Sequence, residues 1–146
     1  MSASHPAASL VASALLEAAG VLHVQQALAV MPDDPALGEY RDEFKGVLGM
    51  IEVRPEDSDE KGEGFAGARR VISPTRLFER LDASPEDRVD ARAFLVARLM
   101  DIFMGDRDRH RDQWRWANFG KEKPTLWEPI SRGSSSRLTS TRQAVG

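Results

Sequence analysis

The segment from Ser84 to Gly105 is the feature that most constrains the fold of this chain. Ser84 is a helix-capping residue, Pro85 suits a first helical turn, and two acids follow at the positive end of the helix dipole. Gly105 is a favourable helix stop. The apolar residues between them recur at helical spacing: Val89, Ala93, Val96, Met100 and Phe103, with Leu95 and Leu99 widening the stripe. We therefore expect a long helix with one face in a core.

Shorter segments around this helix predict an α+β fold in which helices dominate. The whole chain has 146 residues, which suits one modest domain and is too short for two separate cores. Apolar periodicity, Pro and Gly positions and β-prone runs mark the elements. They are a helix from Ser4 to Gly20, a possible hairpin of 21–24 and 27–31 closed by the turn 32–35, a strand at 47–53, a short helix at 73–81 and a strand at 127–130.

Composition and charge exclude several classes of protein. The absence of Cys excludes disulfides, thiolate catalysis and Cys-ligated zinc. The net charge of -3 gives no overall case for nucleic-acid binding, and no apolar run reaches the roughly 18 residues of a membrane helix. No basic segment precedes the first apolar stretch, so we expect no signal peptide. Residues 54–64 read as an acidic loop, and 131–146 as a disordered Ser/Arg-rich tail after a domain at 1–130.

The stretch that follows the long helix carries the chemistry, and it reads GDRDRHRDQWRWANF. A calcium loop starting at Asp106 needs Gly at its sixth position and Glu at its twelfth, where this chain has Arg111 and Ala117. Arg residues interleaved with Trp suit nucleic acid, but neighbouring Asp residues neutralise them. A salt-bridged turn with the Trp side chains in the core is favoured over nucleic-acid binding, and in it Asp106 either pairs with Arg109 or caps a turn.

Phosphoryl transfer is the third interpretation of the same stretch. A kinase catalytic loop places an Asp beside the attacking hydroxyl and a side-chain amide on the magnesium ion. Here Asp108 is the candidate base, and Gln113, five residues later, is the candidate metal ligand. His110 is a second candidate catalytic residue, which in this interpretation packs and orients the loop. Gln in place of the usual Asn sets the oxygen one methylene further out.

This loop resembles those of atypical kinases: the lipid-kinase-like enzymes, the HipA-type toxin kinases and the Golgi secretory-pathway kinases. A broader resemblance, over about residues 5–130, is to a kinase-like region of large bacterial envelope proteins that also carry a calcineurin-like phosphoesterase domain and an outer-membrane barrel. Its specific string is GDRDRHRDQWRW. The resemblance implies an incomplete protein-kinase-like fold, mainly of the C-lobe, and ATP and Mg²⁺ as cofactors of the full-length protein. It also implies missing flanking domains, a cell-envelope location for full-length relatives, and a nucleotide partner, with Glu52 bordering the adenine pocket.

Departures from that family pattern determine what we expect of this chain. The family continues its last strand as W-x-P-I-P-R-D-R-D-Q, whereas this chain reads WEPISRGSS from Trp127, and no Asp follows Asp112. Glu128 is the nearest acid, and it comes too early. The phosphate-covering loop and its Lys are expected ahead of the first helix, where only four residues precede His5. We therefore expect a truncated domain that is inactive alone. The alternative is a non-catalytic envelope or interaction segment in which the Asp-Arg-His loop is structural.

Overall fold

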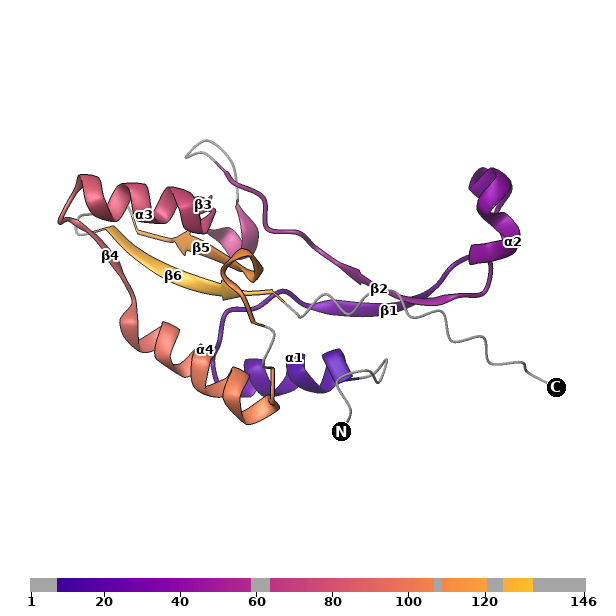
Figure 1. The fold of residues 1–146 in the computed structure, drawn as a ribbon, viewed down its shortest axis with the longest axis horizontal. Coiled ribbons are helices and arrows are strands. Elements are labelled where there is room, and N and C mark those ends of the chain that lie inside the picture. Colours follow the sequence, from indigo (N-terminus) through magenta and orange to yellow (C-terminus); the bar gives the residue numbers. More distant parts are fainter. Residues whose placement is uncertain (1–7, 59–63, 107–108, 121–124, 133–146) are drawn as a thin grey trace.

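A computed structural model describes residues 8–58, 64–106, 109–120 and 125–132, and confirms the predicted α+β class. Most elements belong to one body, from which the β1–β2 hairpin extends with α2 at its tip (Figure 1). The helices are α1 (Ala8–Ala18), α2 (Arg41–Phe44), α3 (Pro74–Ala83) and α4 (Ala91–Met104), and the 3-10 turns are η1 (Pro35–Tyr40), η2 (Phe65–Gly67) and η3 (Arg111–Gln113). The strands are β1 (Gln26–Val30), β2 (Leu48–Glu52), β3 (Arg70–Ile72), β4 (Asp87–Val89), β5 (Trp114–Asn118) and β6 (Thr125–Ser131).

The main sheet has four strands in the order β3-β5-β6-β4. The β5 strand is antiparallel to both β3 and β6, whereas β4 is parallel to β6. Side chains of α3 and α4 meet one face of this sheet, around Trp116 and Trp127. Residues from two irregular segments cover the other face, with Val24 and Ala68 packing against Ala117 and Ile130.

The long helix begins later than predicted. Its N-cap is Asp90, whose carboxylate accepts a hydrogen bond of 2.8 Å from the Ala93 amide. The predicted cap, Ser84, instead accepts from the Glu86 amide at 3.2 Å, and the intervening residues form β4. The prediction was wrong because strand pairing with β6 outcompeted the local helix-start signal. The predicted stop is confirmed, since Gly105 has a left-handed φ of 73°.

The hairpin predicted within residues 21–31 is wrong. The β1 strand pairs antiparallel with β2, which lies within the strand predicted at 47–53 and is one residue shorter at each end. Residues 22–24 instead join the end of β6: the Val24 amide donates to the Ser131 carbonyl, and the Ser131 amide to the Leu22 carbonyl. Only Gln25 and Gln26 separate the two runs, and neither residue favours the positive φ of a two-residue hairpin turn.

The last strand, β6, extends one residue past the predicted strand. It runs through Ser131, which is buried, so that residue belongs to the sheet and not to the tail predicted from 131 onward. Arg132, the second residue of that predicted tail, is also described and partly buried, and 133–146 lie outside the described residues. The acidic loop at 54–64 is described only in part, and its Pro55 is fully buried.

The core contains all three tryptophans, as predicted for Trp114 and Trp116. Trp127 has no exposed surface and packs with Ile72, Leu77 and Trp116. Its indole Nε1 donates to the Asp87 carboxylate at 2.7 Å. Large aromatic side chains contribute most of the burial energy in a small domain, so this cluster anchors β6 against α3.

The α4 helix is apolar on its outer side as well. Leu95, Leu99, Ile102 and Phe103 are each more than half exposed, although Leu95, Leu99 and Phe103 were predicted to belong to the core-facing stripe. Phe94, Ala97 and Met100 face inward instead. Among the described residues, no helix is both long and apolar enough to cross a membrane.

Replacing Trp127 by Ala is expected to lower the free energy of unfolding by about 3–5 kcal/mol, since it leaves a large cavity and removes one of the two hydrogen bonds to the Asp87 carboxylate, the other coming from Arg80. Urea denaturation followed by circular dichroism measures the change. Leu126→Ala is the matched control, because that neighbouring side chain is 42% exposed and its loss should cost less than about 1 kcal/mol. Equal losses in the two variants would contradict the assignment of Trp127 as a core anchor.

Candidate functional site

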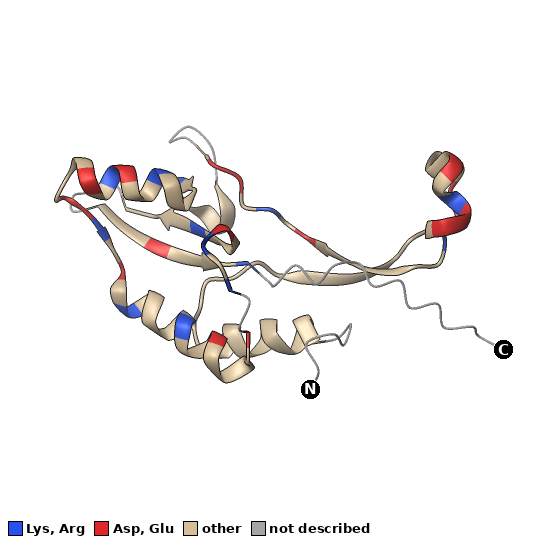
Figure 2. Cartoon of the chain, viewed as in Figure 1, with Lys and Arg blue, Asp and Glu red and all other residues tan. Residues whose placement is uncertain are grey.

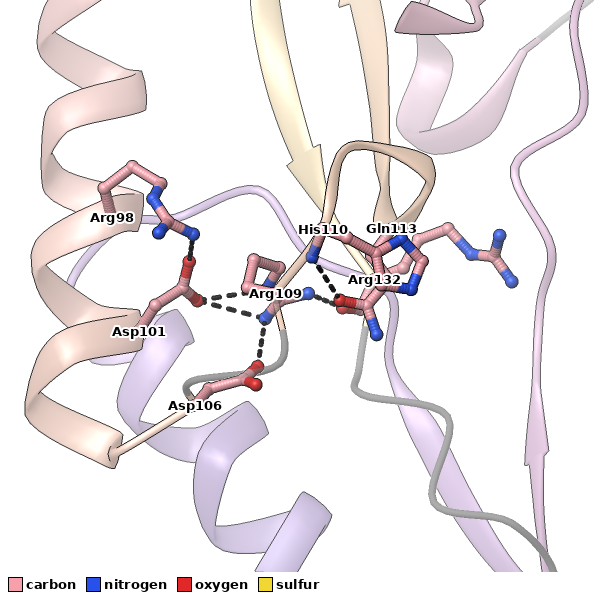
Figure 3. Close-up of polar contacts among 7 residues, drawn as sticks. All are labelled: Arg98, Asp101, Asp106, Arg109, His110, Gln113 and Arg132. Atoms are coloured by element: carbon pink, nitrogen blue, oxygen red, sulfur yellow. Dashed lines mark hydrogen bonds and ion pairs between the residues drawn. The ribbon is translucent and has the colours of Figure 1, made fainter.

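The loop between α4 and β5 is held in place by the buried side chain of Arg109. Only 2% of this side chain is exposed, and its Nη2 lies 3.1 Å from carboxylate oxygens of both Asp101 and Asp106 (Figure 3). A second guanidinium nitrogen, Nη1, donates to the backbone carbonyl of Arg132. The guanidinium also lies 5.3 Å from the ring centre of Trp114. One side chain therefore joins α4, the loop, β5 and the end of β6.

Asp101 is the main anionic partner in this cluster. Its side chain is 1% exposed, and Arg98 Nη1 lies 2.6 Å from its second carboxylate oxygen. Burial raises the pKa of Asp101, while the positive charges of Arg109 and Arg98 oppose that rise. The guanidinium groups of Arg109 and Arg98 thus offset the loss of hydration of the Asp101 carboxylate. Asp101 and Asp106 both contact Arg109.

The predicted pairing of Asp106 with Arg109 is confirmed, but the role of Asp101 was missed. A signal for it exists in the sequence. Asp101 interrupts the inward-facing apolar residues of α4, and an acid at such a position is rarely buried without a cationic partner. Its partner could not be chosen from the sequence, because several Arg residues lie nearby along the chain.

Gln113, the predicted metal ligand, lies at the end of η3 and is 8% exposed. Its amide oxygen accepts a hydrogen bond of 3.1 Å from the His110 backbone N–H. The Gln113 backbone N–H donates back to the His110 carbonyl. The side-chain oxygen thus has a structural partner in the turn, and one of its two lone pairs is left for another ligand.

His110 does not pack in the way that was predicted. Its imidazole is 59% exposed and lies 4.0 Å from an Asp112 carboxylate oxygen. The orientation of the loop comes from the neighbouring Arg109. Asp108, the predicted base, lies outside the described residues.

Glu52, predicted to border an adenine pocket, lies at the end of β2. One of its carboxylate oxygens is 3.2 Å from Arg132 Nη2, and the other accepts from Gln26 Nε2 at 2.8 Å. The Arg132 backbone N–H in turn donates to the Gln113 carbonyl at 3.1 Å. The structure therefore brings Gln113 and Glu52 to one residue, Arg132, which was not a candidate in the sequence.

A wide hollow of about 1050 Å³ lies near this region, on the sheet face that carries Glu128. Its walls include His23, Arg54 and Phe65, and Glu52 is not among its lining residues. His23 has both ring nitrogens engaged, at 2.7 Å from Ser13 Oγ and 2.9 Å from the Val21 carbonyl, as expected for a satisfied strand histidine. Burial, and to a smaller extent the charge of Asp90, raise the pKa of Glu128.

A glycine pattern beside this hollow was missed in the sequence. Gly62, Gly64 and Gly67 form G-x-G-x-x-G, but they follow β2, whereas a phosphate-covering loop was expected ahead of α1. A Cβ on Gly64 would lie 2.6 Å from the Ala68 carbonyl, and Gly67 has a φ of 78°, so both positions require glycine. Gly62 lies outside the described residues, and the pattern alone is weak evidence of nucleotide binding.

Within the described residues, no three His, Asp or Glu side chains come together in a group that could hold a metal ion. Figure 2 shows Lys and Arg interleaved with Asp and Glu along α3, whereas α1 and β1 carry few charges. The chain matches no protein-family model, no curated protein and no solved structure. The geometry of the loop therefore carries the functional argument.

Replacing Asp101 by Asn is expected to lower the free energy of unfolding by about 3 kcal/mol, since it leaves the buried Arg109 with Asp106 alone. Asp106→Asn should cost less, because that carboxylate is 16% exposed. Chemical denaturation at neutral pH compares both with Asp82→Asn, an exposed control on α3. If Asp101→Asn were as stable as the control, the ion pair would not organise the loop.

Replacing Glu128 by Gln is expected to stabilise the protein at neutral pH by under about 1 kcal/mol. Burial raises the folded-state pKa of Glu128 above its unfolded-state value of 4.5, so the unfolded chain loses this proton at lower pH than the folded protein does. The free energy of unfolding therefore falls as pH rises from the unfolded-state pKa through the folded-state pKa. Denaturation midpoints should coincide for wild type and variant near pH 3.5 and diverge by pH 7. Glu79→Gln, an exposed control, should show no such divergence. A constant difference at all pH values would rule out this titration as the cause.

Proposed function

We propose that this chain is the catalytic-loop region of an ATP- and Mg²⁺-dependent phosphotransferase-like domain, and that it is inactive alone. The observation that carries the proposal is the junction at Arg132. Its backbone N–H donates to Gln113, and its carbonyl accepts from Arg109, so the end of β6 lies against the loop. Kinase-type catalysis needs this juxtaposition, because the loop amide and an acid that follows the next strands share the metal ions.

The order of elements supports the same function. A long helix, α4, leads into the loop, and the loop leads into the β5–β6 hairpin. The buried pair of Arg109 and Asp101 joins the end of the loop to α4. Catalysis of phosphoryl transfer depends mainly on such fixed positioning of charged groups.

The expected inactivity of the isolated chain has two causes. The second metal ligand is missing at its expected position, because Gly133 follows Arg132 where the family pattern has Asp. In addition, the Gln113 oxygen is already an acceptor for the His110 N–H, which weakens it as a metal ligand. Loss of the metal removes most of the charge stabilisation that this reaction requires.

A non-catalytic interaction segment is the second candidate function. The observation that favours it is the complete use of Arg109 in ion pairs and in a backbone hydrogen bond, together with the exposed ring of His110. In this alternative the Asp-Arg-His sequence only connects α4 to β5. The two candidates differ in what an added acid after β6 should do.

We expect Gly133→Asp to raise the affinity for Mg²⁺ about tenfold, because it adds a carboxylate next to the junction of Arg132 with Gln113. Isothermal titration calorimetry measures Mg²⁺ binding with and without ATP. The unaltered chain should show no tight, metal-dependent ATP binding.

The matched control is Gly120→Asp, which adds the same charge at an exposed glycine outside the loop. Adding Gln113→Leu to Gly133→Asp should remove the gain, with circular dichroism confirming that the variant folds. An equal gain in Gly120→Asp, or none in Gly133→Asp, would favour the non-catalytic segment. Tight Mg²⁺–ATP binding by the unaltered chain would refute its inactivity.

A further inference from the structure

We propose that Arg54, Arg115 and Arg132 form a binding site for a phosphate group. The site goes beyond the proposed function, because it uses neither Asp108 nor the side chains of His110 and Gln113. It depends on three guanidinium groups that come from separate segments: the chain after β2, strand β5 and the end of β6.

Strand register places two of these side chains on one face of the sheet. Arg115 of β5 lies opposite Ile130 of β6, and Arg132 follows Ile130 by two residues. The Arg132 amide continues the pairing with its hydrogen bond to Gln113. Arg115 and Arg132 are therefore diagonal neighbours, within reach of one another for long side chains. Figure 3 shows the Arg132 side chain extending away from the Arg109 cluster.

The hydrogen-bond donors of these arginines are only partly used. The Nε atoms of Arg115 and Arg132 are buried and have no acceptor. Arg115 Nη1 donates only to backbone carbonyls, those of Asp112 at 3.4 Å and Trp114 at 2.9 Å. Arg54 follows Glu52, the partner of Arg132, by two residues, and it has no hydrogen bond or ion pair among the described residues. Each guanidinium can donate five hydrogen bonds, so the site has spare donor capacity for an anion.

The acids near these three arginines are each paired with a cation. Arg132 is paired with Glu52, but its side chain remains 20% exposed. Two further acids lie near Arg115: Asp57, which lies 3.3 Å from Arg76 and is shared with it, and Asp112, whose side chain is 76% exposed and lies 3.7 Å from Arg111. Burial lowers the pKa of Arg115, and the charges of Arg132 and Arg54 lower it further, while the charges of Asp57 and Asp112 partly oppose them. A bound anion would relieve this repulsion.

The chemistry of guanidinium groups points to phosphate as the ligand class. Their planar donor pairs match phosphate oxygens, and three groups from different directions suit a ligand with several equivalent acceptors. Arg54 also lines the hollow of about 1050 Å³, so the rest of a larger molecule that carries the phosphate has room beside the site. Four acids also line this hollow, namely Glu17, Glu56, Asp57 and Glu128, so the part of the ligand that enters it should not be anionic. Inorganic phosphate and the phosphate chain of a nucleotide are the two sources of this chemistry.

Calorimetric titration of the chain with phosphate, pyrophosphate and ATP tests the site, in chloride buffer without divalent metal. We expect saturable binding. Arg115→Gln and Arg132→Gln should each weaken it about tenfold, whereas Glu52→Gln should tighten it by freeing Arg132. Arg88→Gln, on the exposed side of β4, is the matched control and should change affinity less than twofold. Arg115→Lys keeps the positive charge but loses the planar donor pair, so it separates the effect of charge from the effect of hydrogen-bond geometry. Circular dichroism confirms the fold of each variant.

Tighter binding of ATP than of pyrophosphate would identify a nucleotide as the source, and equal binding would identify free phosphate. The absence of saturable binding of any of the three by wild type would overturn the site. Equal weakening by Arg88→Gln would overturn it too, since it would show only a general effect of charge. The measurement needs neither Mg²⁺ nor Gly133→Asp, so its failure is separate from failure of the phosphotransferase proposal.

Discussion

The buried contact between Arg109 and Asp101 is the interaction on which the rest of the loop depends. A charged pair this deeply buried stabilises a structure only when nearly all its hydrogen-bonding groups are matched. Here Arg98 forms a second ion pair with Asp101. Arg109 forms a second ion pair with Asp106 and donates a hydrogen bond to the Arg132 carbonyl. Because these partners come from the helix, the loop and the last strand, the network defines how the three segments meet. The positions of Gln113 and Glu52 follow from that junction.

Elements with strong local signals were predictable from the sequence. The helix that follows Ser73 and Pro74 begins there, with Ser73 accepting from the Arg76 amide, and α4 ends at Gly105. Both signals act within a few residues, so tertiary contacts do not overrule them. The start of α4 was not predictable in this way. Its preceding residues make a parallel strand with β6, whose partner residues begin at Thr125.

The same distinction applies to the site. Asp106 and Arg109 are three residues apart, so their pairing could be predicted from spacing alone. The pair of Glu52 and Arg132 joins residues 80 positions apart, so no local sequence pattern predicts this contact. A motif therefore indicates which side chains carry chemistry, whereas the fold decides which of them meet. Arg132 shows this most clearly, because its importance comes from its neighbours.

The central position of β6 has a consequence for how the chain folds. This strand is among the last described residues, yet it pairs with β5 and β4 and also contacts residues 22–24. During synthesis, the sheet cannot close until residue 131 has left the ribosome. Until then, the apolar side chains of the earlier segments that pack against β6 stay exposed to water. Such late, long-range closure slows folding and exposes the nascent chain to aggregation. Co-translational folding should thus begin with the helices and the β1–β2 hairpin, whose contacts are local.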